Sequence, residues 1–265
     1  ALTAEGESDM AKKAKPETQT KYRKGRSGLL FAILAGILIA ASVVAACTVF
    51  FRVETVTVEG TSRYTQEEVV ATADVEMGAN MILTPGGQIA QRIYEALPYV
   101  DQVEVKKRFP TTIHLVITET QPALVLQGTA SAWLLDAKGK LLEPVAEGMD
   151  TSGLVQVTGL DLMEPKQGAQ AQTTPENQGR LNGLVGLTQA LAKREMLSHI
   201  TTIDVSSATE IVMSYENRLS VKLYNNVDFD RKLRALEQIV AVAGENGTGS
   251  INMKANDRVI WSQGG

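Results

Sequence analysis

The hydrophobic pattern of this chain starts with an unbroken apolar stretch. Residues 29–51 contain no charged side chain. A helix needs about 20 apolar residues to cross the hydrocarbon core of a bilayer, whereas the apolar part of a cleaved signal peptide has only about 7–15. The stretch has the first length, so we expect a membrane-spanning helix over residues 28–51.

The next segment alternates in the way that strands do. Val53, Thr55 and Thr57 fall on one face and Glu54, Val56 and Val58 on the other, and the segment ends at Gly60, which predicts a strand closed by a turn. Thr65 then precedes Glu68 by three residues. This is the spacing of a capping box, in which each side chain binds a free N–H at the start of a helix. We therefore expect a strand followed by a helix.

A second helix and two more strands follow. Ile89, Ile93 and Leu97 are four residues apart, which predicts a helix from about residue 87 to 97 with one apolar stripe. Two alternating segments then flank Phe109-Pro110. In the second of them, one face carries Ile113, Leu115 and Ile117, and the other carries Thr112, His114 and Val116. The predicted order over residues 52–121 is strand, helix, helix, strand, strand.

Residues 122–262 are mainly strand-like, and residues 263–265 form a short tail. The first predicted hairpin turns at "DAKGK", where Asp136 and Gly139 are typical turn residues. Residues 163–182 are rich in Gln, Pro, Gly and Thr without apolar periodicity, which indicates a surface loop. Two amphipathic helices are expected over residues 184–197 and 228–246; the second has its apolar positions at Leu233, Leu236, Ile239, Val240 and Val242. The fold class is therefore α+β, with a mainly antiparallel sheet in this part.

The charges before the apolar helix predict its orientation in the membrane. Seven basic and four acidic side chains precede it, so residues 1–27 form a polar tail of net charge +3. An excess of Lys and Arg beside a span marks its cytoplasmic side. We expect a single-pass protein of type II, with a cytoplasmic basic tail and the bulk of the chain outside.

The remaining charge and the cysteine count exclude several classes. The whole chain carries −4, so a tail of +3 leaves −7 for the part beyond the span. Nucleic-acid binding needs a basic surface, so we exclude it. Cys47 is the only cysteine, which leaves no disulfide in the external part. "VAAC", which ends at Cys47, resembles a lipobox, so lipidation of Cys47 after cleavage stays an alternative.

A search for reactive groups finds no constellation. The chain has two histidines, His114 and His199, and they are far apart in sequence. With one cysteine inside the apolar stretch, neither a zinc site nor a Cys–His pair can be assembled. The glycines of "GENGTGS" follow a helix instead of a strand, which is the wrong context for phosphate binding. We expect no catalytic residue, cofactor, metal or small-molecule substrate.

The element order after one span is similar to that of a POTRA domain, and the residues resemble the bacterial FtsQ/DivIB family of cell-division proteins. "VETVTVEG", "WLLDAKGKLL" and the stretch from Glu95 to Ala123 carry the likeness. In that stretch the family pattern is matched by Pro98, Val100, Val105, Arg108, Phe109, Pro110, Thr112, Ile113, Leu115, Ile117, Glu119, Pro122 and Ala123. It departs at Phe109, where Trp is common. The resemblance implies a POTRA domain over residues 52–121 followed by a β domain.

The resemblance also implies a function. Members of this family are non-enzymatic scaffolds at the division septum that link early and late division proteins and help to regulate septal peptidoglycan synthesis. Their partners are other bitopic proteins of the FtsL and FtsB/DivIC type and the septal peptidoglycan synthase complex. Capture of a partner strand at a sheet edge would fit this role. The implied contacts are Ile251, Asn252, Met253, Lys254, Val259, Ile260 and Trp261, with Val56, Val58, Gly60 and Arg108 as a second candidate set.

Two other functions stay open at the level of sequence. One is a POTRA-type receptor or chaperone for exported polypeptides, which would also bind by edge pairing. The other is a lipoprotein anchored at Cys47. The first predicts several POTRA copies and a membrane barrel, whereas the sequence shows one copy and a helical span.

Overall fold

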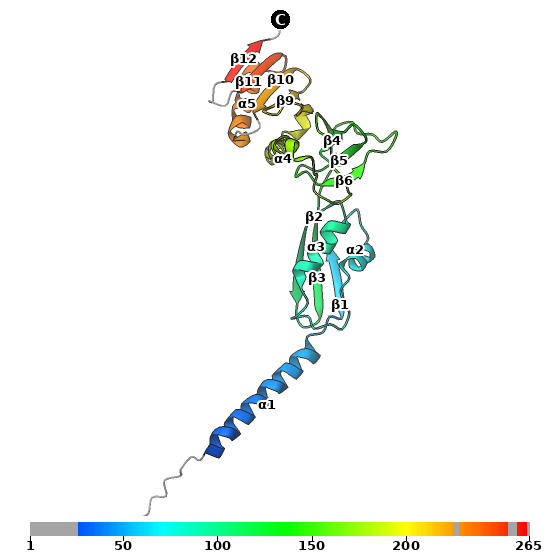
Figure 1. The fold of residues 1–265 in the computed structure, drawn as a ribbon, viewed down its shortest axis with the longest axis vertical. Helices are drawn as coiled ribbons and strands as arrows, with labels where there is room; N and C mark the ends of the chain where they lie inside the picture. The colour runs from blue at the N-terminus through cyan, green and yellow to red at the C-terminus, as the bar shows by residue number, and fades with distance from the viewer. Residues whose placement is uncertain (1–25, 225–227, 254–258, 264–265) are drawn as a thin grey trace, which may run out of the picture. The chain divides into compact units, whose positions relative to one another are not determined.

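The computed structural model describes residues 26–224, 228–253 and 259–263, and only the backbone at residues 26, 27, 259, 261 and 263. The chain divides into two compact units, residues 1–50 and 51–265. The described part of the first unit is the helix α1, Arg26–Phe50 (Figure 1). The second unit contains two sheets and four α-helices in its described residues.

Helix α1 has the length and composition of a membrane-spanning helix. Residues 28–50 have a mean hydropathy of 2.8, and none of the span is buried inside the structure. The two hydroxyl side chains of residues 28–50 donate back to the helix, Ser42 Oγ to the Leu38 carbonyl and Thr48 Oγ1 to the Ala45 carbonyl, both at 2.8 Å. An apolar environment would therefore meet few unsatisfied polar groups along α1.

The N-terminal sheet domain, residues 51–120, has the predicted element order. Its elements are β1 (Thr55–Glu59), α2 (Gln66–Ala73), α3 (Gly86–Ala96), β2 (Val100–Arg108) and β3 (Thr112–Glu119). The sheet order is β1-β3-β2, with β1 parallel and β2 antiparallel to β3. The β-α-α-β-β prediction is confirmed.

Local sequence explains the helices of this domain. The capping box forms: Thr65 Oγ1 accepts from the Glu68 N–H at 3.2 Å, and Glu68 Oε2 accepts from the Thr65 N–H at 2.8 Å. In α3 the predicted apolar stripe is buried, with Ile89 and Ile93 almost inaccessible to solvent. These helices cover the face of the sheet that carries Ile113, Leu115 and Ile117, and the whole set forms one core.

The C-terminal sheet domain, residues 121–263, contains nine strands in its described residues. They are β4 (Leu124–Gln127), β5 (Ala132–Leu135), β6 (Leu141–Pro144), β7 (Val155–Thr158), β8 (Ile200–Asp204), β9 (Glu210–Tyr215), β10 (Leu219–Tyr224), β11 (Gly249–Met253) and β12 (Val259–Gln263). Their order is β12-β11-β10-β9-β8-β7-β4-β5-β6. Five of the eight pairings are antiparallel and three are parallel.

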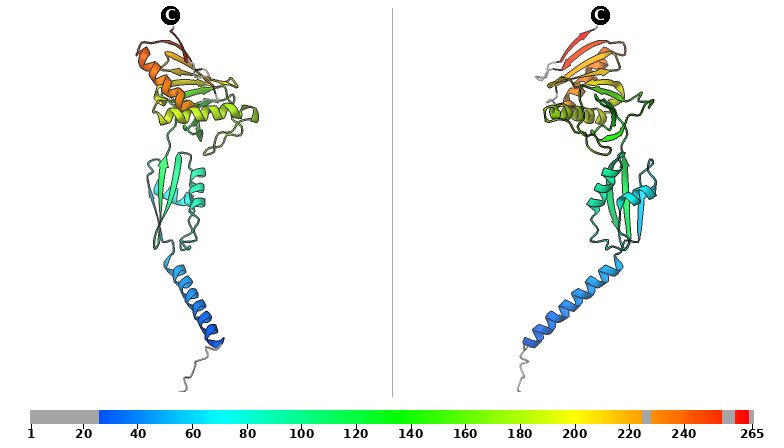
Figure 2. Two further views of the ribbon diagram at one scale, coloured as in Figure 1. Left: turned by 90° about the vertical axis from the view of Figure 1, so that its left-hand side faces the viewer. Right: turned by 45° about the vertical axis from the view of Figure 1, so that its right-hand side comes forward.

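Helices connect two of the parallel pairs, because parallel strands need a long crossover. Helix α4 (Gln178–Lys193) leads from β7 to β8, and α5 (Phe229–Ala243) leads from β10 to β11. Both helices lie on the same side of the sheet (Figure 2). Beneath them one buried row crosses six strands in register, formed by Leu126, Val157, Ile203, Met213, Val221 and Ile251.

Three details differ from the sequence-based expectation. Helix α4 begins at Gln178, so the end of the predicted loop 163–182 is helical. The same helix ends at Lys193, earlier than predicted. Val242 is 80% exposed although it was assigned to the apolar stripe of α5. That stripe ends with the partly buried Ile239 and Val240, because the last turn of α5 extends past the core.

Candidate partner-binding surfaces

Strand β12 ends the nine-stranded sheet. It pairs with β11 in antiparallel register, from Gly249 opposite Gln263 to Met253 opposite Val259. Within the described ranges no further strand follows β12. An edge strand of this kind presents a row of backbone N–H and C=O groups to which another strand can pair.

Alternation divides the predicted contact residues between the two faces. Ile251 and Met253 are fully buried in the core beneath the helices. Asn252 and Ile260 lie opposite each other on the other face, where Ile260 is 45% exposed. For Val259 and Trp261 the structure describes the backbone pairing alone, and Lys254 lies outside the described residues.

The face of the sheet away from the helices is open over β8 to β12, and sequence analysis did not identify it. A row of hydroxyl side chains crosses these strands in register: Thr202, Ser214, Ser220, Ser250 and Ser262. Next to it, Asn252 lies between Lys222 and Ile260. The Oδ1 atom of Asn252 is shielded from solvent and has no hydrogen-bond partner among the described residues.

Strand pairing alone brings these residues together, since they come from segments separated by up to 60 positions. The alternation of Ser220, Lys222, Ser250 and Asn252 with apolar residues in the sequence predicts that each of these two strands has one polar face. Nothing in the sequence revealed which strands would be neighbours. The solvent-accessible groups of the open face are several hydroxyl side chains and the exposed Ile260.

The second predicted set, in the N-terminal sheet domain, has a different structural setting. Val58 is buried and Val56 packs against the same core. Gly60 has φ of +87°, and a Cβ atom there would overlap the Ile117 carbonyl oxygen. Arg108 is exposed at the end of β2. Of the four residues, only Arg108 has an exposed side chain.

Glu119, one of the residues that carry the family resemblance, organises the turn between β1 and α2. Its carboxylate accepts hydrogen bonds from Thr61 Oγ1 (2.7 Å), Ser62 N (2.9 Å), Ser62 Oγ (2.7 Å) and Arg63 N (2.9 Å). Burial raises the pKa of Glu119, but these donors together outweigh it and lower the pKa to about 2. The role of Glu119 visible here is to hold a turn in place.

A polar junction connects the two sheet domains. Lys140, just after the turn of the β5–β6 hairpin, is buried, and its Nζ donates to the carbonyls of Tyr94 (2.8 Å) and Val100 (2.7 Å). It also lies 3.6 Å from the centre of the Tyr94 ring. Burial lowers the pKa of Lys140 to about 8, against the attraction of Asp136 and Asp101. The cation thus meets the carbonyl end of α3, where a positive charge is favourable.

Other contacts extend this junction. Tyr99 donates a hydrogen bond to Glu143, and Lys138 Nζ lies 2.6 Å from Asp101 Oδ1. Part of the polar segment 163–182 takes part as well, because Gln170 Nε2 donates to the Tyr94 hydroxyl at 2.9 Å. The segment predicted as a surface loop therefore packs against α3 in its first half.

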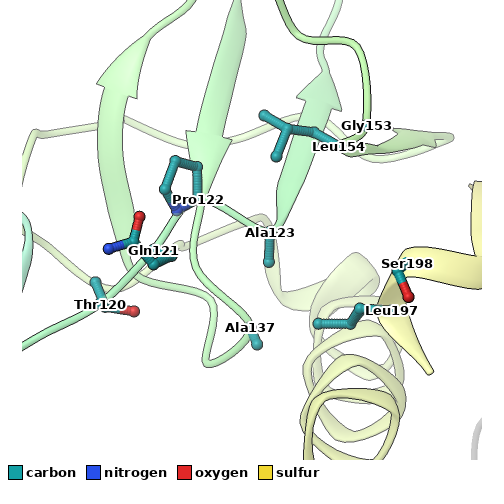
Figure 3. A pocket seen from close by; sticks show the side chains of 9 residues that line it. All are labelled: Thr120, Gln121, Pro122, Ala123, Ala137, Gly153, Leu154, Leu197 and Ser198. Carbon is teal, nitrogen blue, oxygen red and sulfur yellow. The ribbon is translucent and has the colours of Figure 1, made fainter. Parts of the chain in front are cut away.

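A hollow of about 360 Å³ lies where the chain passes from one domain to the other. Residues 120–123 line one side, and Leu197 and Ser198 line the other (Figure 3). Its lining contains no acidic, basic or histidine side chain. Over the described residues, no group of three or more His, Cys, Asp or Glu side chains is arranged to hold a metal ion.

Comparison with known proteins identifies the N-terminal sheet domain. Residues 51–120 match the family model "POTRA domain, FtsQ-type". The chain is 39% identical over 100 residues to the cell division protein FtsQ of Streptomyces venezuelae, covering 38% of this chain and 34% of that protein. It is 22% identical over 168 residues to the cell division protein DivIB of Clostridium acetobutylicum, covering 63% of this chain and 65% of that protein.

These matches span between a third and two thirds of the length of the relatives. A solved extracytoplasmic domain of DivIB from Geobacillus stearothermophilus aligns with 47% of this chain and 93% of its own, at 16% identity. Its TM-score of 0.30 is too low to establish a shared arrangement of the whole fold.

The relatives, the POTRA match and the structure point to one family. The sequence predicted a POTRA domain after an apolar helix, and the family model covers the β-α-α-β-β region that the structure shows. The family consists of non-enzymatic division proteins, which agrees with the prediction that this chain is not an enzyme. With its FtsQ-type POTRA domain and the preceding apolar helix, the chain belongs to the FtsQ/DivIB family of cell-division proteins.

Proposed function

We propose that this chain is a membrane-anchored scaffold of the division machinery that captures partner proteins at the C-terminal edge of its large sheet. It links early and late division proteins at the septum and helps to regulate septal peptidoglycan synthesis. Its membership of a non-enzymatic division family supports this role.

Helix α1 is the anchor in this proposal. Its length and hydropathy suit a bilayer, and the net charge of +3 before it favours a cytoplasmic N-terminus. The two sheet domains then lie outside the membrane. Cys47 lies in the last turns of α1, and in this proposal it stays part of an uncleaved span.

The free edge of β12 is the observation that carries the proposal. Five residue pairs hold β12 on β11, while its other edge has no strand beside it in the part of the chain that the structure describes. A segment from a partner of the FtsL or FtsB/DivIC type would pair with this edge through backbone hydrogen bonds. Ile260 and Asn252, on the open face next to the edge, would add contacts that select the partner.

Two proline substitutions test edge pairing. Consecutive residues of a strand direct their N–H groups to opposite edges of the strand. One of the variants Ile260→Pro and Trp261→Pro therefore removes a backbone hydrogen bond to β11, and the other removes an N–H group from the free edge. The variant that keeps the unfolding midpoint of the parent identifies the outward N–H. We expect that variant to lose co-purification with the partner and recruitment to midcell in cells depleted of the native protein.

Trp261→Phe is the matched control, because it changes the side chain and leaves the backbone N–H in place. Normal midcell recruitment and partner binding by the stable proline variant would rule out pairing at this edge. Uniform membrane fluorescence from the unmodified chain in the same cells would remove the division role itself.

A further inference from the structure

Exposed apolar side chains gather at one end of the POTRA domain. Outside α1, seven large hydrophobic side chains of the described residues are strongly exposed, and four belong to this end. They are Met77 (57% exposed), Ile82 (47%), Leu83 (79%) and Phe109 (58%), which we call the apolar end patch. The first three lie in the α2–α3 connection and the fourth in the β2–β3 turn.

Hydrogen bonds tie these two segments to the first residues after α1. Met81 N donates to the Phe51 carbonyl (2.8 Å), Gly78 N donates to the Val53 carbonyl (2.7 Å), and Val53 N donates to the Ala79 carbonyl (2.9 Å). The Phe109 ring packs edge-on against the Phe51 ring, with 5.4 Å between centroids.

Chain continuity therefore places the patch near the end of α1. Phe51 directly follows Phe50, the last residue of α1. Whatever the angle between the helix and the domain, segments bonded to residues 51–53 remain within a few residues of the point where the chain leaves α1. If α1 spans a membrane, that point is the outer membrane surface.

Charged side chains of both signs border the patch, and its cations lie beside Ile82 and Phe109. Lys107 Nζ donates to the Ile82 carbonyl at 3.1 Å, and Arg108 is exposed next to Phe109. The backbone of Arg52 forms an isolated β-bridge with that of Asn80, the residue before Met81. Glu54, Asp74 and Glu76 are the acidic residues of the same segments, so the two signs are equal in number, and the cations Lys107 and Arg108 are the ones next to Ile82 and Phe109.

We propose that the apolar end patch docks on the surface of the bilayer that α1 enters. Leu83, Phe109 and their neighbours enter the interfacial layer, and Lys107 and Arg108 lie among anionic lipid headgroups. Apolar side chains next to cations are what binds proteins to anionic interfaces. The inference rests on the proposed span of α1, and its consequence is a second membrane contact that fixes the orientation of the POTRA domain.

Quenching by brominated lipids tests this docking in the full chain. Trp133→Phe and Trp261→Phe remove the two native tryptophans. Into this background Leu83→Trp or Phe109→Trp is introduced, and the chain is reconstituted in vesicles of phosphatidylglycerol and phosphatidylcholine brominated near the headgroup end of their acyl chains. We expect loss of most of the tryptophan emission, and less quenching when Lys107→Gln and Arg108→Gln are added.

Two further tryptophan variants serve as controls, one expected to lie away from the membrane and one inside it. Thr118→Trp lies on β3 six residues beyond Thr112, about 20 Å away at the rise of a strand, and should stay unquenched. Leu38→Trp, in the middle of α1, should be quenched by lipids brominated near the methyl end.

One outcome would overturn the docking and keep the span. In it Leu38→Trp is quenched, whereas Leu83→Trp and Phe109→Trp stay as bright as Thr118→Trp. An unquenched Leu38→Trp would remove the span and the docking together. The tryptophans of the patch could stay unquenched while the double variant Leu83→Ser, Phe109→Ser loses midcell recruitment. This result would overturn docking on lipid and indicate that the patch binds a protein.

Discussion

The two sheets differ in the hydrogen bonding of the polar side chains on the face away from their helices. In the POTRA sheet, His114 is buried on the face away from the helices, with Nδ1 2.8 Å from Thr57 Oγ1 and Nε2 3.0 Å from Glu59 Oε2. In the large sheet, Asn252 on the corresponding face has an unpaired Oδ1, and Ile260 beside it is exposed. The first face pairs both ring nitrogens of its buried histidine, whereas the second combines a shielded amide oxygen that has no partner among the described residues with an exposed apolar side chain.

This difference agrees with the positions of the sheets in the chain. The POTRA domain follows the anchor directly and has a closed core with internally bonded turns, which suits a spacer of fixed shape. The large sheet ends in the free edge of β12. An edge strand leaves backbone N–H and C=O groups available for pairing, so the partner capture proposed above is assigned to this end of the large sheet.

Core truncations should produce the largest effects and show whether the two cores are separate. Leu115 and Leu223 are both fully buried, the first in the POTRA core and the second beneath α5. We expect Leu115→Ala and Leu223→Ala each to lower the free energy of unfolding by about 2–5 kcal/mol. Chemical unfolding of the detergent-solubilised chain measures both.

Because no buried apolar residue is shared by these two cores, the double variant should equal the sum of the single variants within about 0.5 kcal/mol. A larger deviation would mean that the domains are packed as one core, and the comparison above would lose its basis.

Removal of the buried cation tests the junction between the domains. Lys140→Met keeps the length of the side chain but leaves the carbonyls of Tyr94 and Val100 without their donor. We expect a loss of about 1–3 kcal/mol in the free energy of unfolding. The matched control is Lys138→Met, whose ion pair with Asp101 is 58% exposed on the lysine side. It should lose less than about 1 kcal/mol, and equal losses for both variants would contradict a special role for Lys140.

Acid should weaken the POTRA domain through Glu119. Its pKa is about 2 in the folded chain and near 4.5 ordinarily. A lowered carboxyl pKa contributes stability above the ordinary value, and this contribution is lost as the pH falls from 4.5 toward 2. Glu119→Gln should cost about 1–2 kcal/mol at neutral pH and flatten the acid limb of the stability curve. An unchanged acid limb would show that the turn does not depend on the carboxylate.

The helix cap should give the smallest effect. Thr65→Ala removes the acceptor for the Glu68 N–H, and about 1 kcal/mol is typical for such a loss. Thr65→Ser retains the hydroxyl and should restore most of the stability. If serine behaves as alanine does in thermal unfolding, the capping hydrogen bond contributes little and the apolar packing of α2 dominates.

The sequence by itself determined the apolar helix, the order of the POTRA elements and the start of α2. Each depends on residues close in the chain: an uninterrupted apolar run, a capping box of four residues, and stripes of Ile89 with Ile93 or Ile113 with Leu115. The family resemblance came mostly from the same region, because it depends on motifs of consecutive residues such as "VETVTVEG" and the stretch from Glu95 to Ala123.

Only the tertiary structure decided which strands are neighbours in the large sheet. The parallel pairings of β4 with β7, β7 with β8 and β10 with β11 join segments separated by long connections, and alternation within one strand carries no information about its neighbour. The open face, the free edge of β12, the role of Lys140 and the apolar end patch all follow from such long-range contacts. Period and capping are properties of consecutive residues, whereas pairing is a property of the folded chain.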